Sequence, residues 1–415
     1  MKTITKIKVL LLTGLILNSP VIIQAQTWVD VISNTDRDLN SITFASPMLG
    51  WVVGHEGEIR FTINGGANWL PQVSGTDRDL NSVFFISPLI GWAVGQEGTI
   101  LRTTTGGLVW LGGQNSPNAL RDDDSIQDLN SVSFINPLVG WIAGNGGKIF
   151  YTIDGGMNFN MQMSGSVNDL RSIFFITNIG FAVGSSGTIL KTTNGGLNWM
   201  SDSSGTMNEL NSVFFRTPML GWTVGQNGTI LRTTNGGGMW MRDSSGIGED
   251  LNSVFFISDF IGYTIGHGGH IFKSTNGGMT WQMQQSPTDR DLESLVFTAV
   301  SGFACGVEGT IIKTEGPSGI SEINSKTPDK FTLSQNYPNP FNPTTDIKFS
   351  VSKASLVKLL IFDIIGREVE TLVNDNLNPG TYKVSWNAGR FASGMYFFRL
   401  QAGSFVETKK MILLK

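Results

Sequence analysis

Disulfides, long apolar runs and an excess of positive charge are all missing from this sequence of 415 residues. Cys305 is the only cysteine, so no intrachain disulfide can form, and a small buried side chain explains it better than a reactive thiol. No segment after the N-terminal one is long and apolar enough to span a bilayer about 30 Å thick. The net charge of -4 is unlike that of nucleic-acid-binding proteins, which are usually basic.

Glycine and aromatic residues are abundant, with Gly 51, Trp 11 and Phe 26, and no long helical periodicity is found. This composition predicts many short strands joined by tight turns. The chain is also too long for one ordinary hydrophobic core, so we expect several units or a large closed array. The predicted fold class is all-β.

The N-terminus has the pattern of a secretory signal peptide. Three lysines precede an apolar run at residues 9–17, and small residues follow, with a plausible cleavage site after Ala25. A membrane anchor is the alternative, but the run is too short to cross a bilayer. Removal of residues 1–25 takes away three lysines and leaves a net charge of -7.

A unit of about 40 residues repeats along the next part of the chain. Each copy opens with "DLNS" or a close variant, followed by a "GWxxG"-type segment and a "GTILRTT"-type segment, and the first six copies end in a tryptophan or phenylalanine. The seven copies begin at Asp38, Asp79, Asp128, Asp169, Glu209, Asp250 and Asp291. Four strands at this spacing are typical of a propeller blade, so seven blades are predicted.

The turn between the third and fourth strands has the form Thr-x-Asn-Gly-Gly-x-x-Trp. Its polar side chain can bond nearby backbone N–H groups, the glycines allow positive φ, and the aromatic residue closes the hairpin. The residues at the polar position are Asn64, Asp154, Asn194, Asn235 and Asn276. We interpret this turn as structural rather than as a ligand site.

The seventh copy ends after its third strand, whereas a fourth-strand sequence, "TWVDV", precedes the first copy. We therefore expect residues 28–31 to pair with residues 311–314 and to close the ring. An open ring would leave two sheet edges unpaired. The predicted seven-bladed β-propeller covers residues 26–315.

These repeats resemble the Asp-box propellers of the photosystem II assembly-factor family, in which "GWxxGxxGTILRTTNGGxxW" units build seven blades. The resemblance covers residues 27–315. It implies a non-enzymatic scaffold for other proteins. Photosystem assembly itself is not implied, because the chain carries signals for export.

The C-terminal part changes character at a polar linker, residues 316–330. Residues 331–415 then alternate strand and turn sequences, among them "NYPNPFNPTT", "GTYKVSWNA" and "TKKMILLK", and predict a small β-sandwich. This segment resembles the type A C-terminal sorting domain of the type IX secretion system. By that resemblance, residues 331–415 contact the secretion machinery, and the protein is released or attached to the outer surface after passing the periplasm.

One arc of the propeller is a candidate contact site. The connections from the fourth strand of one blade to the first strand of the next should share one face of the propeller with the turns between second and third strands, because strand direction alternates. "TDRDL" and a turn glutamate both occur only in blades 7, 1 and 2, which are neighbours on a closed ring. The candidate binding residues are Asp36, Arg37, His55, Glu56, Asp77, Arg78, Glu97, Asp289, Arg290 and Glu308.

Arg121 and the acids Asp122 to Asp124, in the long connection between blades 2 and 3, would lie near this arc. Solvated turn residues with no binding role are the alternative for the whole arc. A second candidate is the third-strand position held by Arg102, Lys191, Arg232, Lys273 and Lys313, with Phe61 and Tyr151 in the other blades. Aromatic residues at the same position favour packing of the cation stems against neighbouring rings.

Enzymatic function must be weighed, because Asp-box propellers also include sialidases and β-glucan hydrolases. Sialidases use a tyrosine nucleophile, but Tyr151 and Tyr263 replace packing residues of other blades. Glu56, Glu97, Glu308 or Asp122 to Asp124 could form a glycosidase carboxylate pair if they lay roughly 5 to 9.5 Å apart. His267 and His270 lack a third zinc ligand, and Asp122 to Asp124 lack the ligand spacing of a calcium loop.

No nucleotide, metal or other cofactor motif is complete in the sequence. We therefore expect a non-catalytic protein-binding or surface-recognition scaffold with no cofactor. A secreted glycoside hydrolase or glycan-binding protein is the alternative. The partner, protein or surface glycan, is not identified by the sequence.

Overall fold

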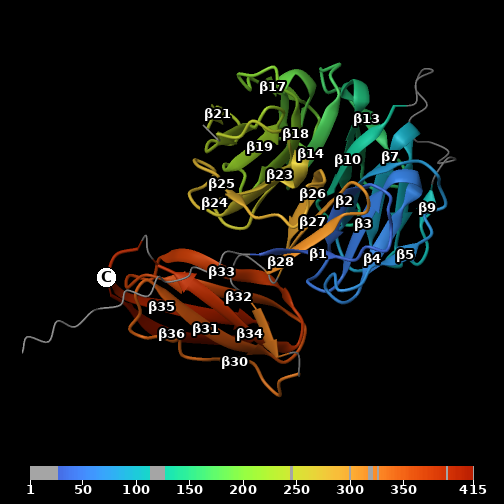
Figure 1. The fold of residues 1–415 in the computed structure, drawn as a ribbon. Helices are drawn as coiled ribbons and strands as arrows, with labels where there is room; N and C mark the ends of the chain where they lie inside the picture. Colours follow the sequence, from blue (N-terminus) through green and yellow to red (C-terminus); the bar gives the residue numbers. More distant parts are fainter. Residues whose placement is uncertain are drawn as a thin grey trace, which may run out of the picture.

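The computed structural model describes residues 27–112, 127–243, 246–298, 301–315, 321–324, 327–388 and 391–414. Its strands form nine four-stranded sheets, seven in the repeat region and two in the C-terminal region. Within the described residues, no helix has the length and apolar character needed to cross a membrane. Figure 1 shows the two regions, with the repeats in blue to orange and the C-terminal sheets in red.

The first four blades follow the predicted pattern of four antiparallel strands in sequence order. Blade 1 consists of β2 (Leu39–Phe44), β3 (Gly50–Gly54), β4 (Ile59–Thr62) and β5 (Leu70–Gln72). Blade 2 consists of β6 (Leu80–Phe85), β7 (Gly91–Gly95), β8 (Ile100–Thr103) and β9 (Leu111–Gly112). Blade 3 consists of β10 (Leu129–Phe134), β11 (Gly140–Gly144), β12 (Ile149–Thr152) and β13 (Asn160–Gln162). Blade 4 consists of β14 (Leu170–Ile176), β15 (Ile179–Gly184), β16 (Thr188–Thr192) and β17 (Met200–Asp202).

The remaining three blades keep this order except at the last strand. Blade 5 consists of β18 (Leu210–Phe215), β19 (Gly221–Gly225), β20 (Thr229–Thr233) and β21 (Met241–Arg242). Blade 6 consists of β22 (Leu251–Phe256), β23 (Gly262–Gly266), β24 (Ile271–Ser274) and β25 (Gln282–Gln284). Blade 7 consists of β26 (Leu292–Phe297), β27 (Ser301–Gly306), β28 (Ile311–Glu315) and β1 (Trp28–Val31).

A short 3-10 turn joins the second and third strands of five blades. These turns are η1 (His55–Gly57), η2 (Gln96–Gly98), η3 (Asn145–Gly147), η4 (Ser185–Gly187) and η5 (His267–Gly269). Each turn contains one residue with φ between 50° and 64°. The chain therefore reverses sharply above each blade and carries its turn side chains on one face of the propeller.

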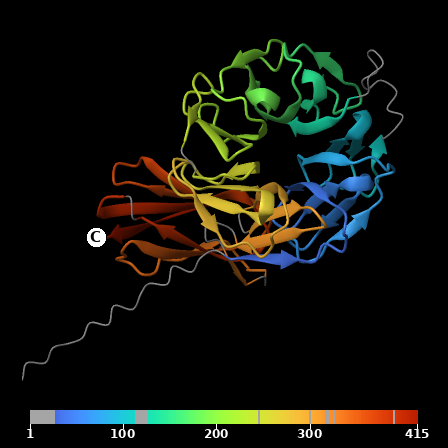
Figure 2. The same cartoon turned by 45° about the horizontal axis from the view of Figure 1, so that its top comes forward.

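Neighbouring blades pack through stacked aromatic rings. The Trp51 ring of blade 1 lies 3.6 Å from the Phe85 ring of blade 2, with an angle of 7° between the planes. Glycine opens the second strand because a Cβ on Gly50 would lie 2.6 Å from the ring of Phe44. Corresponding pairs follow around the propeller, tilted by 37° at Tyr263–Phe297 and stacked at Trp92–Phe134, Trp141–Phe175, Phe181–Phe215, Trp222–Phe256 and Phe303–Phe44. The last pair joins blade 7 to blade 1, and Figure 2 shows the blades following one another around a ring.

The N-terminal strand completes the seventh sheet, as the sequence predicts. β1 is antiparallel to β28, with Trp28 opposite Thr314 and Val31 opposite Ile311. The Trp28 side chain is buried and meets the Tyr263 and Phe297 rings edge-on, with centroids 6.4 and 6.0 Å away. The first strand of the propeller thus belongs to the same sheet as its last.

The Asn-Gly-Gly turns have the predicted structural role. Asn194 Oδ1 accepts a hydrogen bond from the backbone N–H of Asn198 at 3.0 Å, and Thr192 Oγ1 accepts one from Gly196 at 2.9 Å. The same side-chain-to-backbone bonds occur at Asn64, Asp154, Asn235 and Asn276. At Asp154 these bonds lower the pKa of the carboxyl to about 2, although burial alone would raise it.

The C-terminal region consists of two facing sheets with one shared core. One sheet has the order β29 (Ser321–Asn324), β34 (Gly380–Asn387), β31 (Thr344–Val351) and β30 (Thr332–Leu333). The other has the order β33 (Glu368–Leu377), β32 (Ser355–Phe362), β35 (Gly394–Ala402) and β36 (Phe405–Leu413). Phe349, Trp386 and Phe398 are among the side chains buried between them. This arrangement fits the predicted sandwich, but residues 321–324, which the sequence assigns to the linker, are a strand of its first sheet.

Two sequence predictions lie outside the described residues. The signal peptide falls in residues 1–25, and Arg121 with Asp122 to Asp124 falls in residues 113–126.

Candidate binding surface

Three arginine–glutamate ion pairs lie on blades 7, 1 and 2. Each joins the connection that enters a blade to the turn between that blade's second and third strands. The pairs are Arg37 Nη2 to Glu56 Oε2 at 2.8 Å, Arg78 Nη1 to Glu97 Oε1 at 2.6 Å and Arg290 Nε to Glu308 Oε2 at 2.9 Å. The structure thus brings together the predicted arginines and glutamates within each blade, on the shared face that strand alternation predicts.

The backbone of each glutamate is held in a left-handed conformation, with φ of 51° at Glu56, 50° at Glu97 and 51° at Glu308. This conformation costs a non-glycine residue about 1 kcal/mol. An aspartate of the next blade accepts each turn N–H, as Asp79 Oδ1 does from Glu56 at 2.9 Å. Asp38 Oδ1 accepts from Glu308 at 2.8 Å in the same way, so this link also joins blade 7 to blade 1.

The three pairs are open to solvent. Side-chain exposure is 41% and 68% for Arg37 and Glu56, and 48% and 66% for Arg290 and Glu308. Exposed ion pairs of this kind contribute only about 0.2 to 1 kcal/mol to stability. Their charges are therefore accessible to a partner, and replacing them should not unfold the propeller.

The remaining predicted residues surround these pairs. Asp36, Asp77 and Asp289 are exposed in the connections that carry the arginines. His55 lies between two neighbouring blades, with Nδ1 3.4 Å from Asp38 Oδ2 and Nε2 3.9 Å from Asp79 Oδ2. We call these ten predicted residues the 7-1-2 arc; they occupy one face, and their binding role stays a prediction.

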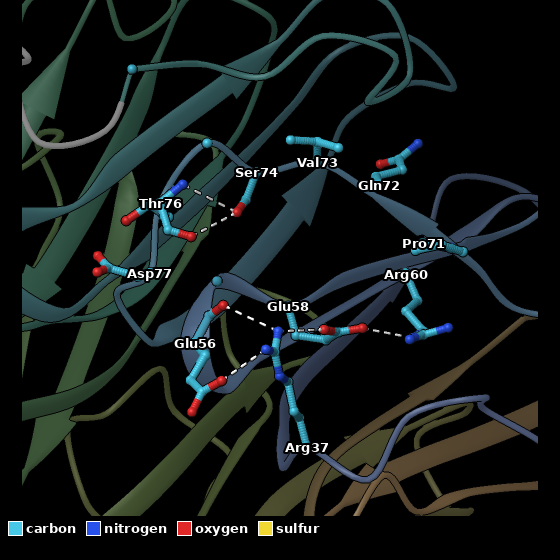
Figure 3. Close-up of a pocket in the computed structure, with 13 residues that line it drawn as sticks. Arg37, Glu56, Glu58, Arg60, Pro71, Gln72, Val73, Ser74, Thr76 and Asp77 are labelled. Carbon is cyan, nitrogen blue, oxygen red and sulfur yellow. Dashed lines mark hydrogen bonds and ion pairs between the residues drawn. The ribbon is translucent and has the colours of Figure 1, made fainter.

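A groove of about 730 Å³ lies in blade 1 within this arc (Figure 3). Arg37, Glu56 and Asp77 line it, together with Glu58 and Arg60. Gly57 brings the turn against the next connection, since a Cβ there would lie 2.1 Å from the Thr76 carbonyl oxygen. A second hollow, of about 580 Å³, lies in blade 7 beside Asp289 and Arg290.

Glu58 and Arg60 line the groove, and sequence reasoning did not select them. Figure 3 shows Arg37 and Arg60 both directed at Glu58. Arg60 Nε donates to Glu58 Oε1 at 2.6 Å, and Arg37 Nη1 donates to Glu58 Oε2 at 3.0 Å. A position-by-position comparison of the third strands would have found them, because no other blade has a glutamate or an arginine at these two positions.

The three third-strand lysines pack against aromatic rings, as predicted for this position, whereas Arg232 pairs with Asp243. Lys191, Lys273 and Lys313 place Nζ 6.0, 5.3 and 5.4 Å from the ring centroids of Phe181, Tyr263 and Phe303, respectively. Burial lowers the pKa of Lys273. This packing favours a structural role for the three lysines.

The described residues contain no group of three or more His, Cys, Asp or Glu side chains placed to hold a metal ion. His267 is exposed in its turn and His270 is half-buried. Each glutamate of the 7-1-2 arc is held in an ion pair with an arginine.

Sequence comparison identifies the repeats. Residues 21–110, 74–166 and 161–245 match the family described as photosynthesis system II assembly factor YCF48. Together these matches extend over more than half of the chain. The chain belongs to this family.

Solved structures agree with the YCF48-family fold. A structure of YCF48 bound to D1 peptide has a TM-score of 0.59 and 21% sequence identity, covering 70% of this chain and 95% of that chain. YCF48 from Cyanidioschyzon merolae has the same TM-score and identity, covering 69% and 98%. The WD40 β-propeller domain of Doa1 has a TM-score of 0.55 at 13% identity, covering 71% and 97%. At these identities the likeness establishes the propeller fold alone.

The C-terminal sheets have a match of their own. Residues 335–414 match the secretion system C-terminal sorting domain. The chain therefore joins a YCF48-family propeller to a sorting domain. No curated protein matches the sequence significantly.

Proposed function

We propose that this YCF48-family propeller is an exported, non-catalytic recognition module that binds a protein segment through the 7-1-2 arc. The observation that carries this proposal is the set of three exposed arginine–glutamate pairs on adjacent blades, beside two hollows. Loops on a rigid scaffold are the usual place for recognition. A fold relative bound to a peptide supports a protein segment as the partner class.

The export part of the proposal depends on the C-terminal region. The sorting-domain match supports delivery by the type IX secretion machinery, which would recognise residues 331–415. The protein would then be released or attached to the outer surface. Deletion of residues 331–415 should leave the propeller in the periplasm, measured by fractionation, and unchanged export would contradict this part of the proposal.

Charge reversal tests the contact site. The purified mature protein would be crosslinked to its partner on the native cell surface, and binding of the isolated partner would then be measured. Replacement of Arg37, Arg78 and Arg290 by Glu should abolish binding. A control variant with Lys148, Arg216 and Arg242 replaced by Glu has the same change in net charge outside the arc and should bind as the parent does. We call the variant with Arg37, Arg78 and Arg290 replaced by Glu the arc variant. If the arc variant still bound the partner, we would assign the contact site to the opposite face of the propeller.

A glycoside hydrolase that acts on surface polysaccharide is the competing function. It needs one carboxyl group that is protonated and one that is ionised, on either side of the glycosidic bond. Glu56, Glu97 and Glu308 are each occupied by an ion pair with an arginine, so none of them faces a substrate alone. Incubation with a panel of glycans should release no reducing ends, and release of reducing ends would favour the hydrolase.

A further inference from the structure

Blade 1 departs from the other blades at two positions of its third strand. Where blade 1 has Glu58, four blades have a threonine, at Thr99, Thr188, Thr229 and Thr310. Where it has Arg60, the others have apolar residues that are all buried, at Leu101, Phe150, Leu190, Leu231, Phe272 and Ile312. The charged pair is therefore particular to the blade at the centre of the 7-1-2 arc.

Stability does not account for this pair. The side chains of Glu58 and Arg60 are only 10% and 12% exposed, so both charges lose most of their hydration. Such a pair is no more stabilising than the well-packed apolar residues that occupy this position elsewhere, and often less. A binding role would explain a charge at the Arg60 position, which belongs to the interior of the other six blades.

The guanidinium group of Arg60 has one edge of N–H donors that its hydrogen bond to Glu58 does not use. Both oxygens of Glu58 are occupied, Oε1 by Arg60 and Oε2 by Arg37. Arg60 uses its Nε in this bond, and its two terminal nitrogens have no hydrogen-bond partner among the residues that the structure describes. Arg60 also lines the blade 1 groove. Its planar terminal edge presents parallel N–H donors of the kind that bind a carboxylate with two hydrogen bonds.

We propose that the terminal edge of the Arg60 guanidinium binds a carboxylate of the partner in the blade 1 groove. This inference rests on the proposed recognition role and specifies the ligand chemistry of that site. The planar shape of a carboxylate matches the two terminal nitrogens. A more highly charged anion such as phosphate would be repelled more strongly by Glu56 and Glu58, which line the same groove.

Two sources could supply the carboxylate, an acidic side chain or the free C-terminus of a peptide. Three synthetic probes separate them: an amidated oligoglutamate, an amidated oligoglutamine and an oligoglutamine with a free C-terminus. The full mature protein should bind the first or the third probe, and the amidated oligoglutamine should not bind. Absence of binding to both carboxylate probes, measured by calorimetry, would overturn the inference.

Two substitutions give opposite expected results. Arg60→Leu restores the residue of blades 2, 4 and 5 and should weaken probe binding by at least about tenfold. Glu58→Thr restores the residue of four other blades, frees the rest of the guanidinium and should tighten binding. Arg232→Leu is the matched control, because Arg232 forms a similarly buried pair with Asp243 at 2.8 Å in blade 5. Melting temperatures of all three variants show that each is folded.

The same variants distinguish this inference from the proposed function. If Arg60→Leu binds the carboxylate probe and the native partner as the parent does, while the arc variant loses the native partner, the inference is wrong and the recognition role stands. If Arg60→Leu loses the probe while the arc variant keeps the native partner, the carboxylate site stands and the 7-1-2 arc is wrong. Equal probe binding by the parent and Arg60→Leu would overturn the inference in either case.

Discussion

The backbone N–H of Ile42 donates a hydrogen bond to Ser294 Oγ at 3.2 Å, across the junction of blades 1 and 7. Each of the other six junctions has the same bond, such as Val213 N to Ser172 Oγ at 3.2 Å. Ile42 and Ser294 are 252 residues apart in the sequence. The junction that joins the two ends of the propeller is therefore built like those between consecutive blades.

Ser294→Ala should destabilise the protein about as much as Ser172→Ala does. Each substitution removes the acceptor of one inter-blade hydrogen bond, which should lower the free energy of unfolding by about 1 kcal/mol. Urea denaturation measures both variants. A loss of stability in Ser172→Ala with none in Ser294→Ala would mean that this hydrogen bond does not stabilise the junction of blades 7 and 1 in solution.

Glu293→Asn should stabilise the protein near neutral pH. In five junctions an asparagine at this position donates from Nδ2 to a leucine carbonyl of the next blade, as Asn252 does to Leu292 at 3.0 Å. Ionised Glu293 cannot donate to the equivalent carbonyl of Leu39. The substitution supplies a donor and removes a half-buried charge, so we expect a gain of about 1 kcal/mol by urea denaturation. Asn211→Glu, the reverse change at the junction of blades 5 and 6, should destabilise, because Asn211 donates to the Leu251 carbonyl at 2.9 Å.

Stability should also depend on pH through Glu293. Burial raises the pKa of this carboxyl, with the charges of Asp291 and Asp38 adding to the effect and those of His267 and His55 opposing it. The folded protein then holds the proton more tightly than the unfolded chain does. The stabilising contribution is complete below the unfolded pKa of about 4.3 and is lost as pH rises through the folded pKa.

Glu293→Gln removes this titration, because its side chain is neutral throughout. The parent should therefore lose stability relative to Glu293→Gln as pH rises above about 4.3, measured as the difference in unfolding free energy. A difference that stays constant with pH would show that Glu293 titrates equally in both states.

Thr192→Val should cost about 1 to 3 kcal/mol, because it leaves the buried N–H of Gly196 without its acceptor. Thr193→Val is the control, since Thr193 is exposed in the same turn and should change stability by less than about 0.5 kcal/mol. Thermal unfolding compares the two. Equal losses of stability in the two variants would contradict the structural role assigned to the Asn-Gly-Gly turn.

The repeated parts of the fold were predictable because identical local chemistry recurs. Strand ends, the Asn-Gly-Gly turns and the pairing of Trp28 with Thr314 all follow from comparing seven copies of one unit. The strand at residues 321–324 was not predictable, because four residues in a polar segment give no clear alternation and the strand depends on pairing with β34.

The site was predictable in part, for a similar reason. Arg37 and Glu56 stand out because the same residues recur in blades 2 and 7, which suggested a shared face but not that they pair with each other. Arg60 occurs once, at a position whose pattern predicts burial. The role that we propose for it rests on its place beside Glu58 and in the groove, which the sequence does not show.

Removal of β1 tests the account most directly, because this strand completes the sheet of blade 7 and leads into blade 1, two of the three blades of the 7-1-2 arc. The mature chain without residues 27–32 would be compared by calorimetry with the parent and with Val29→Ala, a change at an exposed position of the same strand. Loss of Trp28 alone should lower the melting temperature by about 10 °C, and loss of the strand by at least as much. An unchanged melting temperature in the truncated chain would contradict the account.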